Sequence, residues 1–185
     1  MDQPAWNHET IQLYTKAMDF AAVKHRDQRR KDASETPYIN HPIGVANILT
    51  SEGKCFDFEV LIAALLHDTV EDTDTTFSEI ETLFGEKIAN IVKEVTDDKT
   101  LPKMTRKELQ IEKAKTASTK AKLVKLADKL YNLRDLQRGL PEEWTEERRS
   151  QYFIWAKKVV DNLRGTNQML EDSLDVVFRE QKLID

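Results

Sequence analysis

The sequence predicts an all-α fold. Apolar residues recur at intervals of three and four along most of the chain, which is typical of amphipathic helices. Glycine and proline interrupt helices, and each occurs only five times in 185 residues. Strand signals are nearly absent, because the chain has no sustained alternating runs of Val, Ile and Thr and no Asn-Gly or Asp-Gly turns. We therefore expect a helical bundle of eight or nine helices.

The helix boundaries are predicted from the apolar phase and from residues that favour helix ends. Pro42 suits the first turn of the second helix. Thr76 and Glu79 have the spacing of a capping box, and the short helix that they begin should end at Gly85. Gly165 separates the last two helices. The predicted helices cover residues 7–29, 42–52, 57–67, 77–85, 86–95, 105–114, 118–137, 145–163 and 167–182.

Length and composition predict one globular domain over residues 1–185 and exclude several classes of protein. The formal net charge of -5 disfavours nucleic acid and anionic membranes as partners, because both reward a basic surface. A single cysteine, Cys55, cannot form an internal disulfide, which indicates a reducing compartment. No apolar run reaches membrane-spanning length, and the N-terminus has no signal-peptide pattern. We expect a cytoplasmic protein, with the nucleus as the alternative.

The residues best suited to metal binding or catalysis directly follow an apolar helix. The run at residues 63–66 leads directly into His67-Asp68 and then into Glu71-Asp72. Burial of that helix should carry the acids into the core, where a divalent cation can compensate several of them at once. His41 and Asp128, on other predicted helices, supply a further imidazole and carboxylate, and such a mixed set suits Mn²⁺, Fe²⁺ or Zn²⁺. The absence of thiolates in the set disfavours a structural zinc site.

Each of these residues also has a plainer interpretation when it is taken alone. His41 is compatible with a histidine that makes local hydrogen bonds at the start of a helix. His67-Asp68 is compatible with an imidazolium at a helix C-terminus beside a solvated acid. Asp128 is compatible with an ion pair to a buried Lys or Arg. The spacing of the residues acquires meaning only if a family supplies it.

Four phrases of the sequence carry a family resemblance. They are Arg30-Lys31, Pro37-Tyr38-Ile39-Asn40-His41-Pro42, His67-Asp68-Thr69-Val70-Glu71-Asp72 and Lys125-Leu126-Ala127-Asp128-Lys129-Leu130-Tyr131-Asn132-Leu133-Arg134. In this order they resemble the RelA/SpoT hydrolase domain of the HD phosphohydrolase superfamily. The motif core covers about residues 30–135, and C-terminal helices follow over about 145–182. The chain ends without the synthetase domain of the bifunctional bacterial enzymes, so the resemblance is closest to the small stand-alone hydrolases of metazoans.

The resemblance implies an enzyme that hydrolyses the 3′-pyrophosphate of guanosine 3′,5′-bis(diphosphate), the nucleotide of the stringent response. The products are GDP and pyrophosphate, and Mn²⁺ is the usual metal. The family's metal ligands match His41, His67, Asp68 and Asp128. Its catalytic acidic pair matches Glu71 and Asp72. The alternative interpretation is that these two acids lie in a solvated loop without a catalytic role. Which of the two acids handles the proton stays open.

The anionic substrate requires local positive charge and a binding surface. Arg30 and Lys31 match family positions that contact the nucleotide. The alternative interpretation is that they form the solvated end of a helix. Lys103 is predicted to reach a phosphate, and Asn132 lies one helical turn beyond Asp128, so it faces the same pocket. Tyr38 is expected either to stack on the base or to pack beneath the loop.

Three other functions compete with the nucleotide pyrophosphohydrolase. The same fold and metal would also suit a phosphatase for another ribose-phosphorylated nucleotide such as NADPH, giving NADH and phosphate. A non-catalytic nucleotide sensor is a second alternative, although a pure binder has no need of Glu71 and Asp72. A helical adaptor is the third, and it would leave four metal-capable side chains on apolar faces without a partner. The physiological substrate, the metal and the oligomeric state stay open.

Overall fold

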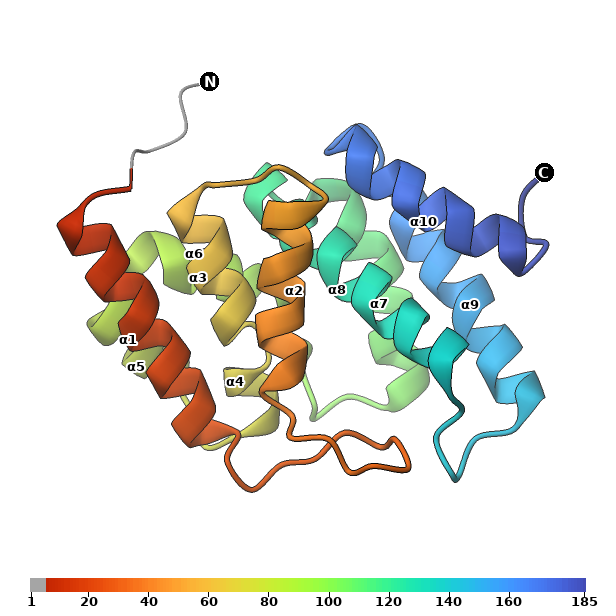
Figure 1. The fold of residues 1–185 in the computed structure, drawn as a ribbon, viewed down its shortest axis with the longest axis horizontal. Coiled ribbons are helices and arrows are strands. Elements are labelled where there is room, and N and C mark those ends of the chain that lie inside the picture. The colour runs from red at the N-terminus through yellow and green to blue at the C-terminus, as the bar shows by residue number, and fades with distance from the viewer. Residues whose placement is uncertain (1–5) are drawn as a thin grey trace.

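The computed structural model describes residues 6–185, and this part of the chain is all-α, as the sequence predicts. Figure 1 shows the helices packed side by side as a bundle. Nine of the helices among the described residues have eight residues or more, and α4 is a single additional turn. The helices are α1 His8–Lys24, α2 Asn40–Ser51, α3 Phe58–Leu66, α4 Thr69–Asp72, α5 Phe77–Phe84, α6 Glu86–Val95, α7 Lys103–Thr116, α8 Thr119–Arg138, α9 Glu146–Asp161 and α10 Gln168–Glu180.

Side-chain caps explain where several helices begin. The Asn7 side chain accepts a hydrogen bond from the backbone N–H of Thr10 at 3.0 Å, and Thr76 accepts one from Glu79 N–H at 3.1 Å. Each cap satisfies a backbone donor that has no partner within its helix. At the other end of α5, Gly85 adopts φ +90°, a region that favours glycine. The predicted limits of the helix between Thr76 and Gly85 are therefore confirmed.

The end of the first helix differs from the prediction. We expected the helix to continue to about Arg29, but α1 ends at Lys24. The carbonyl of Gln28 accepts a hydrogen bond from Tyr38 N–H at 3.0 Å, and Arg30 N–H donates to the carbonyl of Thr36 at 2.8 Å. These backbone groups pair with a later part of the chain and so cannot continue the helical ladder. The segment between α1 and α2 is consequently a loop, at the same end of the bundle as α4 (Figure 1).

The centre of the bundle is α3, which is buried along its length from Glu59 to Leu66. It packs against α1, α2, α6 and α8, and α2 also packs against α8. A helix that is apolar on all sides is stable only inside such a core. His67 and Asp68 directly follow α3, so the chain delivers them from the middle of the molecule to the end where the loop and α4 lie.

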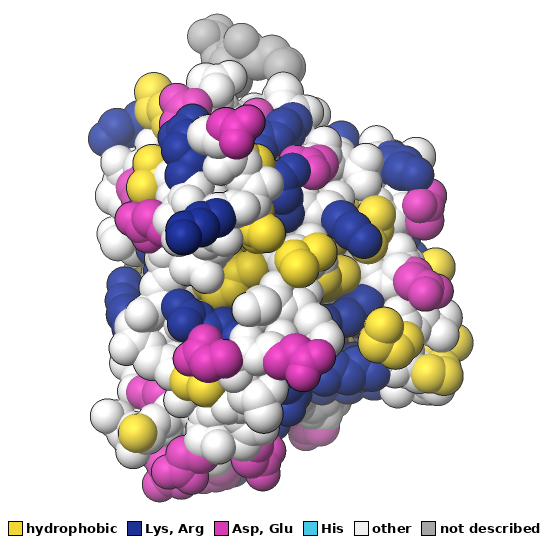
Figure 2. Space-filling model, turned by 90° about the vertical axis from the view of Figure 1, so that its right-hand side faces the viewer, with side chains coloured by type: hydrophobic (Ala, Val, Ile, Leu, Met, Phe, Trp, Pro, Cys, Tyr) yellow, Lys and Arg dark blue, Asp and Glu magenta, His cyan; other side chains and the backbone are white. Residues whose placement is uncertain are grey.

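The C-terminal helices cover the other side of α8. α9 packs against α7 and α8, and α10 packs against α8 and α9. Figure 2 shows the face on which α9 and α10 lie, where hydrophobic, basic and acidic side chains are interspersed in small groups. Among the described residues, no helix has both the length and the apolar character needed to cross a membrane.

The contact between α2 and α8 leads to a stability prediction. A Cβ atom added at Gly44 would lie 2.0 Å from Cε2 of Tyr131, whose ring packs against His41 with 4.9 Å between centroids. Overpacking typically costs about 1–3 kcal/mol, and the better helix propensity of alanine offsets up to about 1 kcal/mol. Gly44→Ala should therefore lower the free energy of unfolding by about 1–2 kcal/mol, measured by urea denaturation.

Gly139→Ala is the matched control for this substitution. Gly139 has an extended backbone with φ -170°, and an added Cβ would meet no atom within 4 Å. The control should be as stable as the wild-type protein. Equal stability of the Gly44→Ala and Gly139→Ala proteins would contradict the packing described here.

Candidate metal centre

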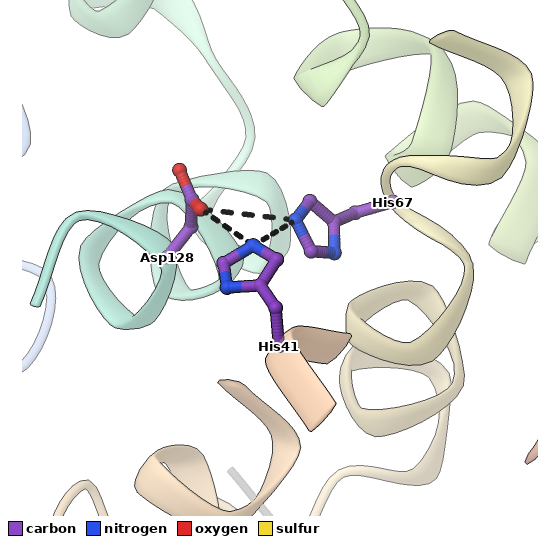
Figure 3. A group of neighbouring side chains, drawn as sticks. All are labelled: His41, His67 and Asp128. Atoms are coloured by element: carbon purple, nitrogen blue, oxygen red, sulfur yellow. Dashed lines mark hydrogen bonds and ion pairs between the residues drawn. The ribbon is translucent and has the colours of Figure 1, made fainter. Parts of the chain in front are cut away.

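Three helices bring two imidazoles and a carboxylate to one point. His41 lies in the first turn of α2, His67 directly follows α3, and Asp128 lies in the middle of α8. Figure 3 shows the three side chains pointing toward one another. The two Nε2 atoms of the histidines are 3.3 Å apart, and Asp128 Oδ1 lies 3.2 Å from His41 Nε2 and 3.8 Å from His67 Nε2. These ligand atoms all lie within 4.8 Å of one another, as a metal site requires.

Asp68 joins the group from the turn after α3. Its Oδ2 lies 3.0 Å from His67 Nε2 and 3.4 Å from His41 Nε2. The hydroxyl of Tyr38 donates a hydrogen bond of 2.7 Å to the same oxygen, which holds the carboxylate in place. The structure therefore brings together all four side chains that were predicted from the sequence as metal ligands.

The hydrogen bonds of His67 fix the nitrogen that is free to bind a metal. Nδ1 of His67 lies 2.8 Å from the carbonyl oxygen of Ala64. Because a carbonyl only accepts, Nδ1 carries the hydrogen, and the neutral ring then presents the lone pair of Nε2 to the group. Orientation of a metal-binding histidine through its second nitrogen is the usual arrangement in metal centres. The donor set of two imidazoles and two carboxylates fits a divalent first-row metal.

The charges of the group support the same conclusion. Burial would lower the pKa of His67, but Asp68 and Asp128 beside it raise that pKa well above its usual value. Burial would raise the pKa of Asp68, but His67 and His41 hold it well below the usual range. The acids thus stay ionised, and a proton on an imidazole balances part of their charge. A divalent cation can replace that proton, so metal binding should release protons.

Two residues of α8 hold Asp128 in its orientation. Lys129 Nζ lies 2.8 Å from Oδ2 of Asp128, and Asn132 Nδ2 donates to Oδ1 at 2.6 Å. Burial would lower the pKa of Lys129, and the neighbouring Asp128 carboxylate instead raises it. The Lys129 ammonium also lies over the Trp155 ring, 5.1 Å from its centroid. Asn132 faces the site one turn beyond Asp128, as the helical spacing predicts.

Glu71 and Asp72 line the same cavity as the metal ligands, and its volume is about 170 Å³. Burial raises the pKa of Glu71 to about 7, although its Oε2 accepts a hydrogen bond of 3.1 Å from Asp97 N–H. Asp72 has different surroundings, because the Lys99 ammonium pairs directly with its Oδ1, whereas the guanidinium of Arg106 lies 3.7 Å from Oε1 of Glu71. The two acids are therefore not equivalent. Glu71 is the one that can take up and release a proton near neutral pH.

Sequence reasoning missed two residues near Asp72, Gln28 and His25. Gln28 Nε2 donates to Asp72 Oδ2 at 3.4 Å, and the Oε1 of Gln28 lies 2.6 Å from His25 Nδ1. The buried His25 ring also packs on Tyr38 at 4.9 Å between centroids. Both residues lie within the helix predicted over residues 7–29, and only the turn that ends α1 brings them to the site.

A larger cavity of about 690 Å³ adjoins the metal centre. Tyr38, Asp72 and Asn132 line both cavities, so the two spaces share a boundary. This volume lies within the range of small-molecule sites in proteins. Tyr152 of α9 also lines the larger cavity.

The predicted basic residues do not all lie in the lining of the larger cavity. Arg30 and Lys31 line the larger cavity. Lys103 is the exposed first residue of α7 and is absent from the described lining of both cavities. Burial, followed by the nearby charges of Arg148, Lys31 and Arg106, lowers the pKa of Lys103. Lys103 therefore belongs to a cluster of positive charge near the cavity.

Arg30 is held firmly in the wall of the larger cavity, in contact with Asn132, which lines both cavities. Its Nη2 donates hydrogen bonds to Asn132 Oδ1 at 3.0 Å and to Asp135 Oδ2 at 2.7 Å. The guanidinium lies over the rings of Tyr38 and Tyr131, with 5.6 and 5.7 Å to their centroids. These contacts join the loop after α1 to α8.

Sequence comparison agrees with this geometry. The family profile described as "HD domain" matches residues 17–157, which include all four candidate ligands. The chain belongs to the HD-domain family.

Relatives of this HD-domain chain resemble it over nearly its whole length. "Guanosine-3′,5′-bis(diphosphate) 3′-pyrophosphohydrolase MESH1" of Xenopus tropicalis is 64% identical over 169 residues, covering 91% of this chain and 94% of the relative. The human protein of the same name is 62% identical over 175 residues, covering 95% and 97%. "GTP pyrophosphokinase rsh" of Brucella melitensis is 36% identical over 90% of this chain but only 22% of its own length.

A solved structure described as a metazoan ortholog of SpoT that hydrolyses ppGpp superposes with a TM-score of 0.93 and 56% identity. The match covers 98% of this chain and 100% of that one. Together with the relatives above, it confirms the resemblance to RelA/SpoT-type hydrolases that the motifs indicated.

Proposed function

We propose that this protein hydrolyses the 3′-pyrophosphate of guanosine 3′,5′-bis(diphosphate) to GDP and pyrophosphate, with Mn²⁺ as its metal. The observation that carries the proposal is the convergence of His41, His67, Asp68 and Asp128 beside Glu71. The activity named for relatives that are 62–64% identical over 91–95% of the chain supports the choice of substrate. A cytoplasmic location is also proposed, and the single, buried and unpaired Cys55 supports it.

The residues of the smaller cavity divide the chemistry among them. A divalent metal held by the two histidines and two aspartates would lower the pKa of a bound water and polarise a phosphoryl oxygen. Glu71, with its pKa of about 7, accepts the proton of the attacking water. The water oxygen forms a bond to the phosphorus on the ribose 3′-oxygen, and the bond between that phosphorus and the 3′-oxygen breaks. The 3′-oxygen takes up a proton and leaves as part of GDP.

The larger cavity is the proposed site for the nucleoside and its 5′-diphosphate. Arg30, Lys31 and Asn132 line it and supply charge and hydrogen-bond donors. Lys103 adds positive charge from the start of α7. Tyr38 has a positioning role, because its hydroxyl holds Asp68 and its ring packs on His25.

Incubation of the Mn²⁺-loaded protein with a panel of nucleotides tests the proposal. Chromatography should identify GDP and pyrophosphate as the products from guanosine 3′,5′-bis(diphosphate). EDTA should abolish product formation and added Mn²⁺ should restore it. Release of phosphate from NADPH without turnover of the guanosine nucleotide would favour the phosphatase alternative. Tight nucleotide binding without product over hours would favour a sensor, and full turnover by metal-free protein would refute the metal-dependent mechanism.

A further inference from the structure

Lys125 is a buried cation in the cavity of the candidate metal centre. It lies on α8 one helical turn before Asp128, so both side chains are on the same face of the helix. Only 6% of its surface is exposed, and it lines the 170 Å³ cavity together with the two histidines and Glu71. The mechanism above assigns it no role.

The Lys125 ammonium lacks the partners that other lysines of α8 have. Lys129 lies 2.8 Å from Asp128 Oδ2, and Lys120 lies 2.7 Å from Asp57 Oδ2. Within residues 6–185, no carboxylate oxygen lies within 4 Å of Lys125 Nζ and no hydrogen bond joins it to another group. A largely buried ammonium without a counterion is costly, and an anion that enters the cavity would compensate its charge.

The surrounding charges do not neutralise Lys125. Burial, and then the neighbouring Lys129, lowers the pKa of Lys125 to about 8, while Asp97 and Asp128 raise it from a distance. The side chain is therefore still mostly protonated at neutral pH. The carboxylates of Asp68 and Asp128 are paired with the two histidines and with Lys129, so they do not neutralise Lys125.

We propose that the Lys125 ammonium binds phosphoryl oxygens of the pyrophosphate group that enters the metal cavity. This inference rests on the proposed function, which places a phosphoryl group in that cavity. The ammonium supplies a point charge and up to three donors to the anionic oxygens. It contacts the group before hydrolysis and also holds the pyrophosphate product.

Direct binding of inorganic pyrophosphate to the Mn²⁺-loaded protein tests this role without any turnover. Loss of a hydrogen bond from a charged donor should weaken pyrophosphate binding by about 10- to 100-fold in Lys125→Met, measured by isothermal titration calorimetry. Lys125→Arg should retain part of the affinity. Lys158→Met is the matched control, because Lys158 is exposed on α9 outside the described lining of both cavities. Its affinity should equal that of the wild-type protein.

Two further measurements separate an anion-binding residue from a merely structural one. Lys125→Met removes an uncompensated buried charge, so it should raise the Tm of the nucleotide-free protein while it lowers kcat/KM by at least about 10-fold. Its Mn²⁺ content should match that of the wild-type protein. A lower Tm or lost Mn²⁺ would show a structural role and overturn the inference.

The inference and the proposed function can fail independently. Wild-type affinity for pyrophosphate in Lys125→Met would overturn the inference even if the guanosine nucleotide is hydrolysed. Absence of pyrophosphate binding by the wild-type protein would overturn it as well. Conversely, pyrophosphate binding that depends on Lys125 in a protein without nucleotide turnover would leave the anion site intact and refute the proposed reaction.

Discussion

Replacing His67 by alanine should remove the bound metal and lower turnover by at least about 10³-fold, equivalent to about 4 kcal/mol of transition-state stabilisation. His67 Nε2 lies between Asp68 and Asp128, at 3.0 and 3.8 Å from their nearest oxygens, and alanine leaves that position without a donor. The remaining imidazole and two carboxylates hold a first-row metal much more weakly than the full set of four. Metal content by mass spectrometry and pyrophosphate release should therefore fall together.

His8→Ala is the matched control for this loss. His8 is the exposed first residue of α1 and lies far in sequence from the centre. Its substitution should change neither metal content nor turnover, and circular dichroism should show both variants folded. Retention of stoichiometric metal and of full activity by folded His67→Ala protein would refute the assignment of the metal centre.

Replacing Glu71 by glutamine should leave the metal bound and lower kcat by about 10²- to 10⁴-fold, the usual contribution of a general base. Glutamine keeps the size of the side chain and the acceptor for Asp97 N–H but cannot take up a proton. Since the pKa of Glu71 is about 7, wild-type kcat/KM should fall as the pH falls through about 7 and the carboxylate becomes protonated. The residual activity of Glu71→Gln should lack this acid limb.

Asp72→Asn separates the roles of the two neighbouring acids. Asp72 pairs with Lys99 and accepts a hydrogen bond from Gln28, so its charge is already balanced. The Asp72→Asn protein should keep the acid limb of the wild-type pH profile, even if its rate is lower. If the acid limb persists in Glu71→Gln and vanishes in Asp72→Asn, Asp72 rather than Glu71 accepts the proton.

The order of the helices was predictable from periodicity and local end signals. Thr76 and Gly85 limit α5 because a cap and a left-handed glycine act over only a few residues. The end of α1 was not predictable in this way. It depends on the pairing of Gln28 and Arg30 with residues 36–38, and tertiary pairing of that kind overrides a local helical pattern.

The site was predictable only in part. His41, His67 and Asp128 are recognisable as metal-capable residues, but their grouping came from the family resemblance and from the packing of α2, α3 and α8. Lys125 escaped notice because a lysine on an amphipathic helix is usually solvated. Nothing local distinguishes it from Lys122, whose ammonium lies 3.3 Å from the carbonyl of Asn162. Only the packed structure shows which of the two faces the cavity.

The contacts of Arg30 have a consequence for selectivity. Its guanidinium is already oriented by Tyr38, Tyr131 and Asn132, so a ligand that binds it loses little side-chain entropy in doing so. However, a ligand that uses Nη2 must compete with the carboxylate of Asp135 at 2.7 Å. A doubly charged phosphoryl group can win that competition, whereas a singly charged group has no advantage over the carboxylate. We therefore expect Arg30 to favour doubly charged phosphoryl groups in the larger cavity that it lines.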